Sequence, residues 1–484
     1  MNLDQFECAS RENRLGSISG YAGTLKDLVG KACGGCLENK NRCFNTARQC
    51  AHFDAVDQLS VVEGAVVIDH APGGCSTGHL MWNSFGRRIA PMVGKTPKNV
   101  VVIATNMNEG DTVFGSVEKL RQAILFANER HRPKVIFVAG SCVSAIIAED
   151  IQNVIERLQD ELNVPIAFAS CEGIRSKMWS SGFDAAQHAI VKALLKAPKE
   201  KSNTVNFIIF WPTIRPFLDP ALAALGLEPL FLSGFAAPDD YARASQSVAT
   251  VGQCGVLASY LGGALEEKYK VPFIREHFPY GINGFESWYR RIAALVGKQT
   301  EAEGYIKSQR EKYMPEIESL RKRLSGKKAI VALGPGMAFE LIKILRDLGL
   351  DVVHTVGYHF DPILDGGAPE NSPVTVYAKD AEDLDVSISD AQQHEFYKIV
   401  KKYQPDIIVT RGHGSGIWAA RLGAAPVVYG PSAYNLYAYA GLIGLGHQIL
   451  DEIGNGNMIR LVKKHYHSPF TAKFEAKDTF AYLE

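Results

Sequence analysis

Cysteines in glycine-rich turns are the residues of this chain best suited to metal chemistry. Cys75 lies in DHAPGGC, and Cys142 lies in AGSC, where a strand pattern gives way to a helix pattern. Iron–sulfur clusters are bound by thiolates on glycine-rich loops, because glycine lets backbone N–H groups approach the cluster sulfides. A cysteine taken alone is more often a small core residue, so these segments carry weight only together.

Cys254 stands where an amphipathic helix should begin, in QCGVLASYLGGALEEKY. The free N–H groups and the dipole at a helix N-terminus favour the thiolate, which is the form that binds metals or attacks a substrate. A purely structural cysteine would be equally suited to any position on the apolar face. The position therefore indicates a reactive or metal-binding thiol.

A further group of cysteines, in KACGGCLENKNRC, admits several interpretations. Cys33 and Cys36 form a CxxC pair that suits zinc or a redox dithiol, and Cys43 follows closely. No second CxxC or HxxxH follows at zinc spacing, so structural, metal-binding and incidental roles stay open. Cys8 and Cys171 are expected not to be ligands, although Cys171 ends a strand pattern.

The elements that must position these cysteines follow a repeating pattern. From residue 99 onward, short β-branched apolar runs end at a Gly, Ser or Cys turn, and a helical pattern follows each. Runs without alternation suit strands buried on both faces, and strands separated by helices imply parallel sheets. The sequence predicts an α/β fold of three doubly wound, Rossmann-like domains. The predicted segments are an N-terminal extension with the Cys-rich stretch (1–50), two domains (51–203 and 204–325), and a third domain with the C-terminal segment (326–484).

Binding sites in open α/β sheets form beyond the carboxyl ends of the strands. Cys142, Cys171, residues 357–359 and residues 412–416 fall at such strand ends, and Cys254 lies just before a helix. We therefore expect the three domains to surround a central cleft that holds a metallocluster.

Composition limits the class of protein. The 484 residues are too many for one core, and the hydrophobic (46%) and charged (21%) fractions are ordinary for a globular protein. Lys+Arg and Asp+Glu number 52 each, so no nucleic acid is expected as a partner. The polar N-terminus has no signal core, and no apolar run approaches the ~20 residues that span a bilayer. We expect a cytoplasmic protein without membrane contact, whose cysteines are not in disulfides.

Four sets of segments, in order, resemble the nitrogenase component 1 superfamily, and specifically its catalytic D-type subunit. ARQC, HAPGGC and AGSC have the order and approximate spacing of three cysteines that this family contributes to a P-type cluster. QCGVLASYLGGALEEKYKVPF resembles the helix whose leading cysteine binds the terminal iron of the family's large cofactor. CEGIRSKMWSSG resembles a third signature, and SGKKAIVALGPG and PDIIVTRGHGSGI resemble third-domain signatures. The K-type partner of the family lacks the equivalent of Cys254.

The resemblance implies two metal centres. Cys50, Cys75 and Cys142 would bind an [8Fe-7S] P-type cluster shared with a partner subunit. Cys254 would bind a large iron–sulfur cofactor of the [8Fe-9S-C] kind, whose heterometal the sequence does not specify. A second cofactor ligand is implied at His359 in VGYHF or at His413 in RGHGSG, and either is equally well explained as a hydrogen-bonded loop histidine.

Departures from the family pattern argue against dinitrogen reduction. Trp179 and Phe183 stand where the family has a Gln and a His beside the cofactor, and Trp418 replaces a Lys near the organic acid. The histidine expected near residues 427–431 is absent from PVVYGPSAYN. Homocitrate is therefore in doubt, and a more apolar pocket suits an organic substrate.

Within the superfamily, the chain resembles methylthio-alkane reductase, which cleaves small methyl thioethers such as 2-(methylthio)ethanol or dimethyl sulfide to methanethiol and a hydrocarbon. The resemblance implies a K-type subunit in a D2K2 heterotetramer and an ATP-dependent iron–sulfur reductase of the H type. This chain has no GxxxxGK[ST] loop, so ATP is expected on that reductase. His359 and Glu172 are then candidate proton donors or groups that orient a ligand, and the pocket wall is expected to consist of Trp179, Phe183 and Trp418.

Three other interpretations stay open. A cofactor-assembly scaffold of the same superfamily would hold a precursor cluster without turnover, and the loss of the usual Gln, His and Lys fits it too. A tetrapyrrole reductase subunit would need a wide cleft and is disfavoured by the helix that begins after Cys254. A zinc or redox sensor built on CGGC would leave Cys75, Cys142 and Cys254 unexplained.

Overall fold

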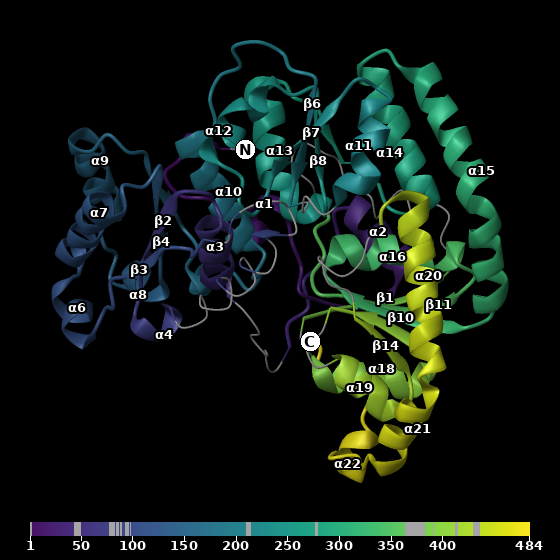
Figure 1. Cartoon of the computed structure of the whole chain (residues 1–484). Coiled ribbons are helices and arrows are strands. Elements are labelled where there is room, and N and C mark those ends of the chain that lie inside the picture. Colours follow the sequence, from purple (N-terminus) through teal and green to yellow (C-terminus); the bar gives the residue numbers. More distant parts are fainter. Residues whose placement is uncertain are drawn as a thin grey trace. The chain divides into compact units, whose positions relative to one another are not determined.

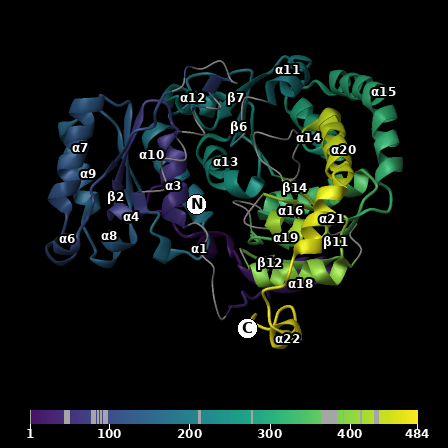
Figure 2. The same cartoon turned by 60° about the horizontal axis from the view of Figure 1, so that its bottom comes forward.

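The computed structural model contains two compact units, which we describe one at a time (Figures 1 and 2). Unit 1 comprises Met1–Leu15 and Gln49–Ile274, and unit 2 comprises Gly16–Arg48 and Arg275–Glu484. The residues described are 2–42, 50–76, 83, 87, 90–91, 96, 98–209, 214–275, 279–363, 383–390, 392–411, 415–428 and 436–484. This division into two units does not test the four segments predicted from the sequence, and their boundaries stay a prediction.

The first sheet of unit 1 is parallel, with the strand order β3-β2-β4-β5. Its strands are β2 (Ala65–His70), β3 (Val102–Ala104), β4 (Val135–Gly140) and β5 (Ile166–Ala169). Every residue of β2, β4 and β5 is buried, which explains why these segments read as continuous apolar runs. The chain passes from β2 outward to β3 and then back across β2 to β4, so the strand order reverses between β2 and β4.

Helices cover both faces of this sheet (Figure 1). Alternate strand residues face α7 (Val117–His131) and α9 (Ile151–Glu161) on one side. The others face α3 (Ala51–Ser60) and α10 (Ser181–Leu194) on the opposite side. Shorter helices follow or precede the strands: α1 (Arg11–Leu15), α4 (Gly73–Ser76), α6 (Glu109–Phe114), α8 (Cys142–Ile146) and the 3₁₀ turn η2 (Gly173–Arg175).

The second sheet of unit 1 is also parallel, in the order β7-β6-β8-β9. Its strands are β6 (Thr204–Ile208), β7 (Glu228–Leu232), β8 (Ala249–Gly252) and β9 (Phe273–Ile274). Its helices are α11 (Arg215–Ala223), α12 (Pro238–Arg243), the 3₁₀ turn η4 (Ala244–Gln246) and α13 (Gly255–Tyr269). One hydrophobic core contains residues of both sheets together with α3, α10 and α13. Helix α10 therefore contributes to the packing of both halves of unit 1.

Unit 2 contains a six-stranded sheet in the order β1-β12-β11-β10-β13-β14. The strands are β1 (Gly20–Thr24), β10 (Lys328–Leu333), β11 (Asp351–Gly357), β12 (Asp385–Ser389), β13 (Ile407–Thr410) and β14 (Ala425–Val428). All pairs are parallel except β1 with β12, so a strand from the N-terminal segment completes this sheet. Helix α16 (Pro335–Asp347) covers one face, and α18 (Gln393–Tyr403) and α19 (Ser415–Leu422) cover the other (Figure 1).

The remaining helices of unit 2 surround this sheet or extend from it. They are α2 (Leu25–Cys33), α14 (Gly281–Leu295), α15 (Gln299–Leu324), α20 (Ala438–Gly454), α21 (Gly456–His465) and α22 (Ala472–Glu475). Within the described ranges, no helix combines the length and the apolarity needed to cross a bilayer. The predicted α/β class with parallel sheets is confirmed.

Candidate metal centre

Two of the predicted cysteine ligands follow the two strands that flank the reversal of strand order in the first sheet. Cys75 lies in α4, after β2, and Cys142 is the first residue of α8, after β4. Because β2 and β4 are adjacent and parallel, their carboxyl ends lie side by side, at the place where open α/β sheets form sites. Ser141 and Ser144 cap α8 reciprocally, which fixes the turn that presents Cys142.

Cys50 reaches the same place from a different element. It is the N-cap residue of α3, with extended backbone angles (φ −106°, ψ 166°). A Cβ atom built on Gly173 would lie 3.6 Å from Cys50 Sγ and 3.7 Å from Cys142 Sγ. The two thiols therefore lie next to the same glycine, although the three residues are far apart in the sequence.

The electrostatics of Cys75 place it in the same group. Although Cys75 as a residue is exposed, its thiol is partly shielded from water, and this shielding is the main cause that raises the thiol pKa, followed by the negative charge of Asp69 and then by Cys50 and Cys142. Burial also raises the pKa of the neighbouring Cys171 thiol, together with the charge of Glu172. The Cys171 thiol donates a hydrogen bond to Gly140 O, with an Sγ–O distance of 3.4 Å. Cys171 is thus an internal hydrogen-bonded thiol, whereas Cys50 and Cys75 are exposed and Cys142 is half-buried.

These residues fit a cluster of several irons better than a single ion. Among the described residues, no group of three or more His, Cys, Asp or Glu has the geometry that holds one metal ion. A Cβ on Gly173 would lie 3.1 Å from Cys50 Cβ and within 3.7 Å of the sulfurs of Cys50 and Cys142, so a glycine is needed beside these two thiols. Cysteines from separate turns that meet beside a glycine are a donor set suited to an iron–sulfur cluster.

Glu172 directly precedes Gly173 and η2. Its side chain is buried, and its Oε2 lies 3.3 Å from the Arg175 guanidinium. Burial raises the pKa of the Glu172 carboxyl against the opposing effect of Arg175, so this group holds its proton more tightly than a free glutamate. The sequence-based prediction of a proton donor is chemically reasonable at this position and stays a prediction.

Cys254 occupies the predicted position at the start of a helix. It is the N-cap residue of α13, it follows the carboxyl end of β8, and its side chain forms no capping hydrogen bond. Only 9% of its surface is exposed. The thiol therefore lies at the positive end of a 15-residue helix, as the sequence indicated, and its role as a ligand stays a prediction.

Helix α10 connects the two helices that begin after a proposed ligand. At Gly182 the helix approaches α3 so closely that a Cβ would lie 2.1 Å from Ala51 O. Further along, Gln187 donates to Leu257 O and accepts from Leu261 N of α13. Trp179 and Phe183, at the start of α10, contact each other edge to face, with ring centroids 6.0 Å apart. These are two of the three aromatic residues predicted for the pocket wall, and they flank Gly182, where α10 approaches the Cys50 helix.

In unit 2, His359 follows β11 and is buried. Its Nε2 lies 3.3 Å from Asp361 Oδ2, and Ser17 Oγ donates to the other oxygen of that carboxylate. A histidine oriented by a carboxylate suits both a ligand and a structural residue. His413, the other candidate for the second cofactor ligand, lies outside the described residues, as do Cys43 and residues 429–435.

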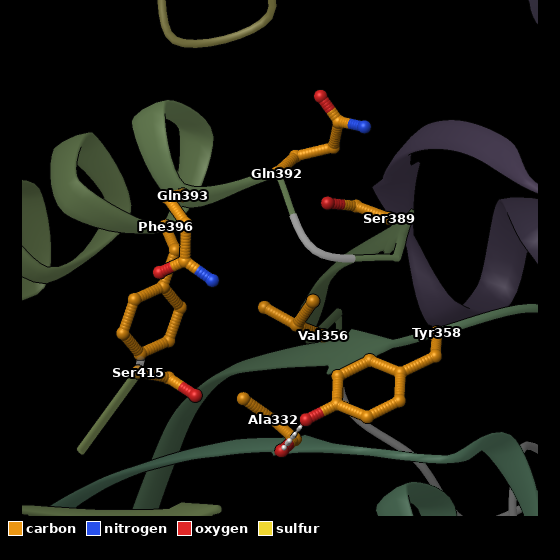
Figure 3. A pocket seen from close by; sticks show the side chains of 8 residues that line it. All are labelled: Ala332, Val356, Tyr358, Ser389, Gln392, Gln393, Phe396 and Ser415. Carbon is orange, nitrogen blue, oxygen red and sulfur yellow. Dashed lines mark hydrogen bonds between the residues drawn. The ribbon is translucent and has the colours of Figure 1, made fainter. Parts of the chain in front are cut away.

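Trp418, predicted as part of the pocket wall, lies on α19 among other aromatic rings. It stacks on Phe470 and contacts Tyr397 and Tyr466 edge to face, with Arg421 over its face. Described residues at the carboxyl edge of this sheet line a small cavity, of ≈ 20 Å³ (Figure 3). Tyr358 donates to Ala332 O across its floor, and Ser389, Gln392, Phe396 and Ser415 also line it. That volume admits about one water molecule and no thioether.

Two other features lie apart from the cysteines. A cavity of ≈ 600 Å³ opens at the amino-terminal edge of the first sheet, lined by the α3–β2 and α7–β4 connections, and it includes none of the predicted site residues. Cys33 and Cys36 are exposed at the end of α2 in unit 2. Cys36 N–H donates to Lys31 O in a turn that ends the helix, and this geometry leaves the role of the pair open.

The profile of one protein family matches most of the chain. It is described as "Nitrogenase component 1 type Oxidoreductase" and covers residues 50–453, from the first proposed ligand to the end of α20. The chain belongs to this family. The family is one of oxidoreductases, and the three thiols at the strand reversal lie within the matched region.

Curated relatives fall into two groups. The chain is 28% identical over 339 residues to the nitrogenase iron-molybdenum cofactor biosynthesis protein NifE of Methanosarcina barkeri, covering 66% of this chain and 71% of the relative. It is 26% identical over 388 residues to the nitrogenase molybdenum-iron protein alpha chain of Methanococcus maripaludis, covering 75% and 77%. The solved structure of nitrogenase Cp1 at pH 6.5 has the same fold, with a TM-score of 0.72 at 20% identity over 89% of this chain and 92% of that one.

Sequence reasoning missed three residues of the site. Gly173 lies beside Cys50 and Cys142, and His52 and Asp69 form a buried hydrogen-bonded pair near them. A signal was present for Asp69, since an acidic residue ends the apolar run AVVIDH directly before HAPGGC. A charge at that position of a buried strand requires a partner.

Proposed function

We propose that this chain is the catalytic D-type subunit of a nitrogenase-like reductase that cleaves the C–S bond of small methylthio-alkanes. The proposal rests on the gathering of Cys50, Cys75 and Cys142 at the strand reversal. Cys254, the N-cap residue of α13, lies in the same unit. Aromatic residues at Trp179 and Phe183, in place of polar groups, support an apolar organic substrate over dinitrogen.

The proposed ligands divide between two groups. Cys50, Cys75 and Cys142 would hold a P-type cluster of the [8Fe-7S] kind, completed by thiolates of a K-type subunit. Cys254 would hold the larger iron–sulfur cofactor, with His359 or His413 proposed as its second ligand from the resemblance alone. When bound, these clusters supply the low-potential electrons that C–S reduction requires.

The chain's own residues would bind the substrate, exclude water and hold a proton. Trp179 and Phe183 present an edge-to-face aromatic pair that excludes water and packs on methyl groups. Glu172 is buried and holds its proton tightly, so it would serve as a proton donor beside the cysteine group. Cys254 is a low-exposure thiol at a helix N-terminus, where the dipole stabilises the thiolate form.

The proposed partners complete the reaction. A K-type subunit would form a D2K2 heterotetramer with this chain, and a separate ATP-dependent iron–sulfur reductase would deliver electrons. The chain lacks a phosphate-binding GxxxxGK[ST] loop, which supports ATP hydrolysis on that separate protein. A cytoplasmic setting is proposed because such clusters need a reducing compartment.

A second candidate function is that of a cofactor-assembly scaffold. The observation that favours it is the 28% identity to a relative named as a cofactor biosynthesis protein. The same three thiols and Cys254 would then hold a cluster for transfer to another protein, with no turnover.

Turnover by the purified complex tests the proposal. The chain and its partner subunit would be purified anaerobically and supplied with the reductase, ATP, a low-potential donor and dimethyl sulfide or 2-(methylthio)ethanol. We expect ATP-dependent methane from the first substrate and ethylene from the second. An iron-replete complex that releases no hydrocarbon would refute the catalytic proposal, and the transfer of its cofactor to an apo-enzyme would then establish the scaffold.

Two variants assign the proposed ligands. Cys254→Ala should abolish turnover and lower the iron content, while the iron bound by Cys50, Cys75 and Cys142 remains. Cys8→Ala is the control, because Cys8 is a half-buried cysteine whose thiol donates to Ala9 O and which is not among the proposed ligands. Full activity of Cys254→Ala would show that Cys254 is not a ligand.

A further inference from the structure

A buried polar network connects the three segments that carry the proposed cluster ligands. His52 lies two residues after Cys50, on the first turn of α3, and Gly140 lies two residues before Cys142. Asp69 is in β2, and Ser76 directly follows Cys75. His52 and Asp69 are both almost completely buried, at 3% and 0% exposure.

Asp69 and His52 join these segments through direct contacts. His52 Nδ1 donates to Gly140 O at 2.8 Å, and His52 Nε2 shares a hydrogen bond of 2.8 Å with Asp69 Oδ1. The other carboxylate oxygen of Asp69 accepts from Ser76 Oγ. One pair of side chains thus touches α3 beside Cys50, the strand end before Cys142, and the turn that holds Cys75.

The pair is held from both sides. Each ring nitrogen of His52 has an oxygen partner, and each oxygen of the Asp69 carboxyl group has a hydrogen-bond partner. Buried hydrogen bonds are protected from competing water. The pair therefore connects elements that the chain itself does not join directly.

We propose that Asp69 and His52 are positioning residues, which hold Cys50, Cys75 and Cys142 at the separations that a multi-iron cluster requires. The inference rests on the proposed role of these cysteines as ligands and assigns the residues that orient them. Groups that orient ligands in this way set both the affinity for the metal and the geometry of the bound centre.

The test removes the connection and then restores it. Asp69→Ala removes the hydrogen bonds of Asp69 to His52 and to Ser76. It should lower the iron retained by the three cysteines by roughly tenfold or more under chelator challenge. Asp69→Asn keeps an oxygen for His52 and an amide that can donate to Ser76 Oγ, so it should restore most of the iron. Ser76→Ala, which leaves the buried pair intact, should fall between Asp69→Asn and Asp69→Ala.

Two readouts separate positioning from general stability. The electron paramagnetic resonance spectrum of the remaining cluster in Asp69→Ala should broaden or shift, which a loss of global stability would not cause. Asn206→Ala is the control, because Asn206 is a buried hydrogen-bonding residue of the second sheet, with partners at Ala244 O, Thr250 Oγ1 and Ser247 Oγ. It should lower the melting temperature and leave the spectrum unchanged.

The chain without metal provides a second measurement if Asp69→Ala accumulates poorly. Dibromobimane, which links neighbouring thiols, should cross-link Cys50 to Cys142 in the wild-type apo-chain and do so more slowly in His52→Gln, because His52 joins the Cys50 helix to the strand end before Cys142.

The outcomes distinguish this inference from the proposed function. If Cys142→Ala retains all its iron, the ligand assignment itself fails. If Cys142→Ala loses iron, but Asp69→Ala and His52→Gln keep the wild-type iron content and spectrum, only the positioning role is overturned.

Discussion

The carboxyl edges of two sheets in this chain look alike in sequence and differ in the side chains that gather there. In unit 1, the strands β2 and β4 end at Cys75 and Cys142, and the sulfurs of Cys50 and Cys142 both lie within 3.7 Å of the position that a Cβ on Gly173 would take. In unit 2, the described residues at the strand ends are polar and aromatic, and they line a cavity of ≈ 20 Å³. The carboxyl-edge rule thus locates where a site can form, while the side chains brought together there decide its chemistry.

The largest effect is expected from a side chain added at Gly173. Gly173→Val should remove most of the cluster iron, because its Cβ would lie 3.1 Å from Cys50 Cβ and 3.7 Å from Cys142 Sγ and would displace both cysteines. Iron analysis measures the loss, and thermal unfolding of the same preparation reports whether the chain is still folded. Gly304→Ala in α15, where a Cβ meets nothing within 4 Å, is the control and should keep its iron. A folded Gly173→Val chain with full iron would mean that the cluster does not lie beside Gly173.

A second prediction concerns the packing of α10, which lies next to the Cys50 helix in unit 1. Asp184 on α10 is fully buried and accepts from Arg11 and Arg14 of α1. Asp184→Leu would leave these guanidinium groups without their shared partner, and the free energy of unfolding should fall by about 3–5 kcal/mol. Segment-resolved hydrogen exchange should show the loss in α1, α3, α10 and α13 of unit 1. Unchanged exchange in α3 would contradict the role of α10 as its support.

A third prediction concerns Trp418 and the aromatic cluster around it in unit 2. Trp418→Ala removes a half-buried ring that contacts Tyr397, Tyr466 and Phe470, so the free energy of unfolding should fall by about 2–3 kcal/mol. Trp418→Phe should recover part of this loss. If Trp418 instead lined the substrate pocket, KM for the thioether would change while stability stayed constant. Denaturant unfolding and steady-state kinetics on the same variants decide between these roles.

The fourth and smallest effect is a dependence of unit 2 on pH. His354 lies within β11, with Nε2 3.1 Å from Ser387 Oγ, and burial lowers its pKa to about 3. The folded chain keeps this histidine neutral while the unfolded chain protonates it below its ordinary pKa of about 6.5. Stability is therefore complete above about pH 6.5 and falls as the pH drops toward 3, by about 2 kcal/mol at pH 5.

The measurement for this prediction is the difference in unfolding free energy between pH 7 and pH 5. His354→Phe should show a smaller difference than the wild type, by about the same 2 kcal/mol. Other buried histidines, such as His188, titrate in both proteins and cancel from the comparison. An equal pH dependence in the two proteins would show that His354 is not held neutral.

Much of the fold could be predicted from local pattern. Apolar runs such as KVIFVAG and KKAIVAL became β4 and β10, and the polar segment after residue 299 became the long helix α15. The pattern missed β2, whose run AVVIDH ends in two polar residues, and β1, which has only five residues and two glycines. Both strands owe their existence to pairing with distant segments, a contribution that a local pattern does not contain.

The candidate site divides in the same way. The sequence determined the chemistry of the thiols and their local positions: Cys142 after a strand, and Cys254 at a helix start, where N–H groups and the dipole act within one turn. Only the tertiary structure decided that Cys50 joins Cys142 around Gly173, and that Asp69 and His52 connect them. The reason is that the order of parallel strands is set by long-range pairing and shared core packing, which bring distant segments together irrespective of their spacing in the sequence.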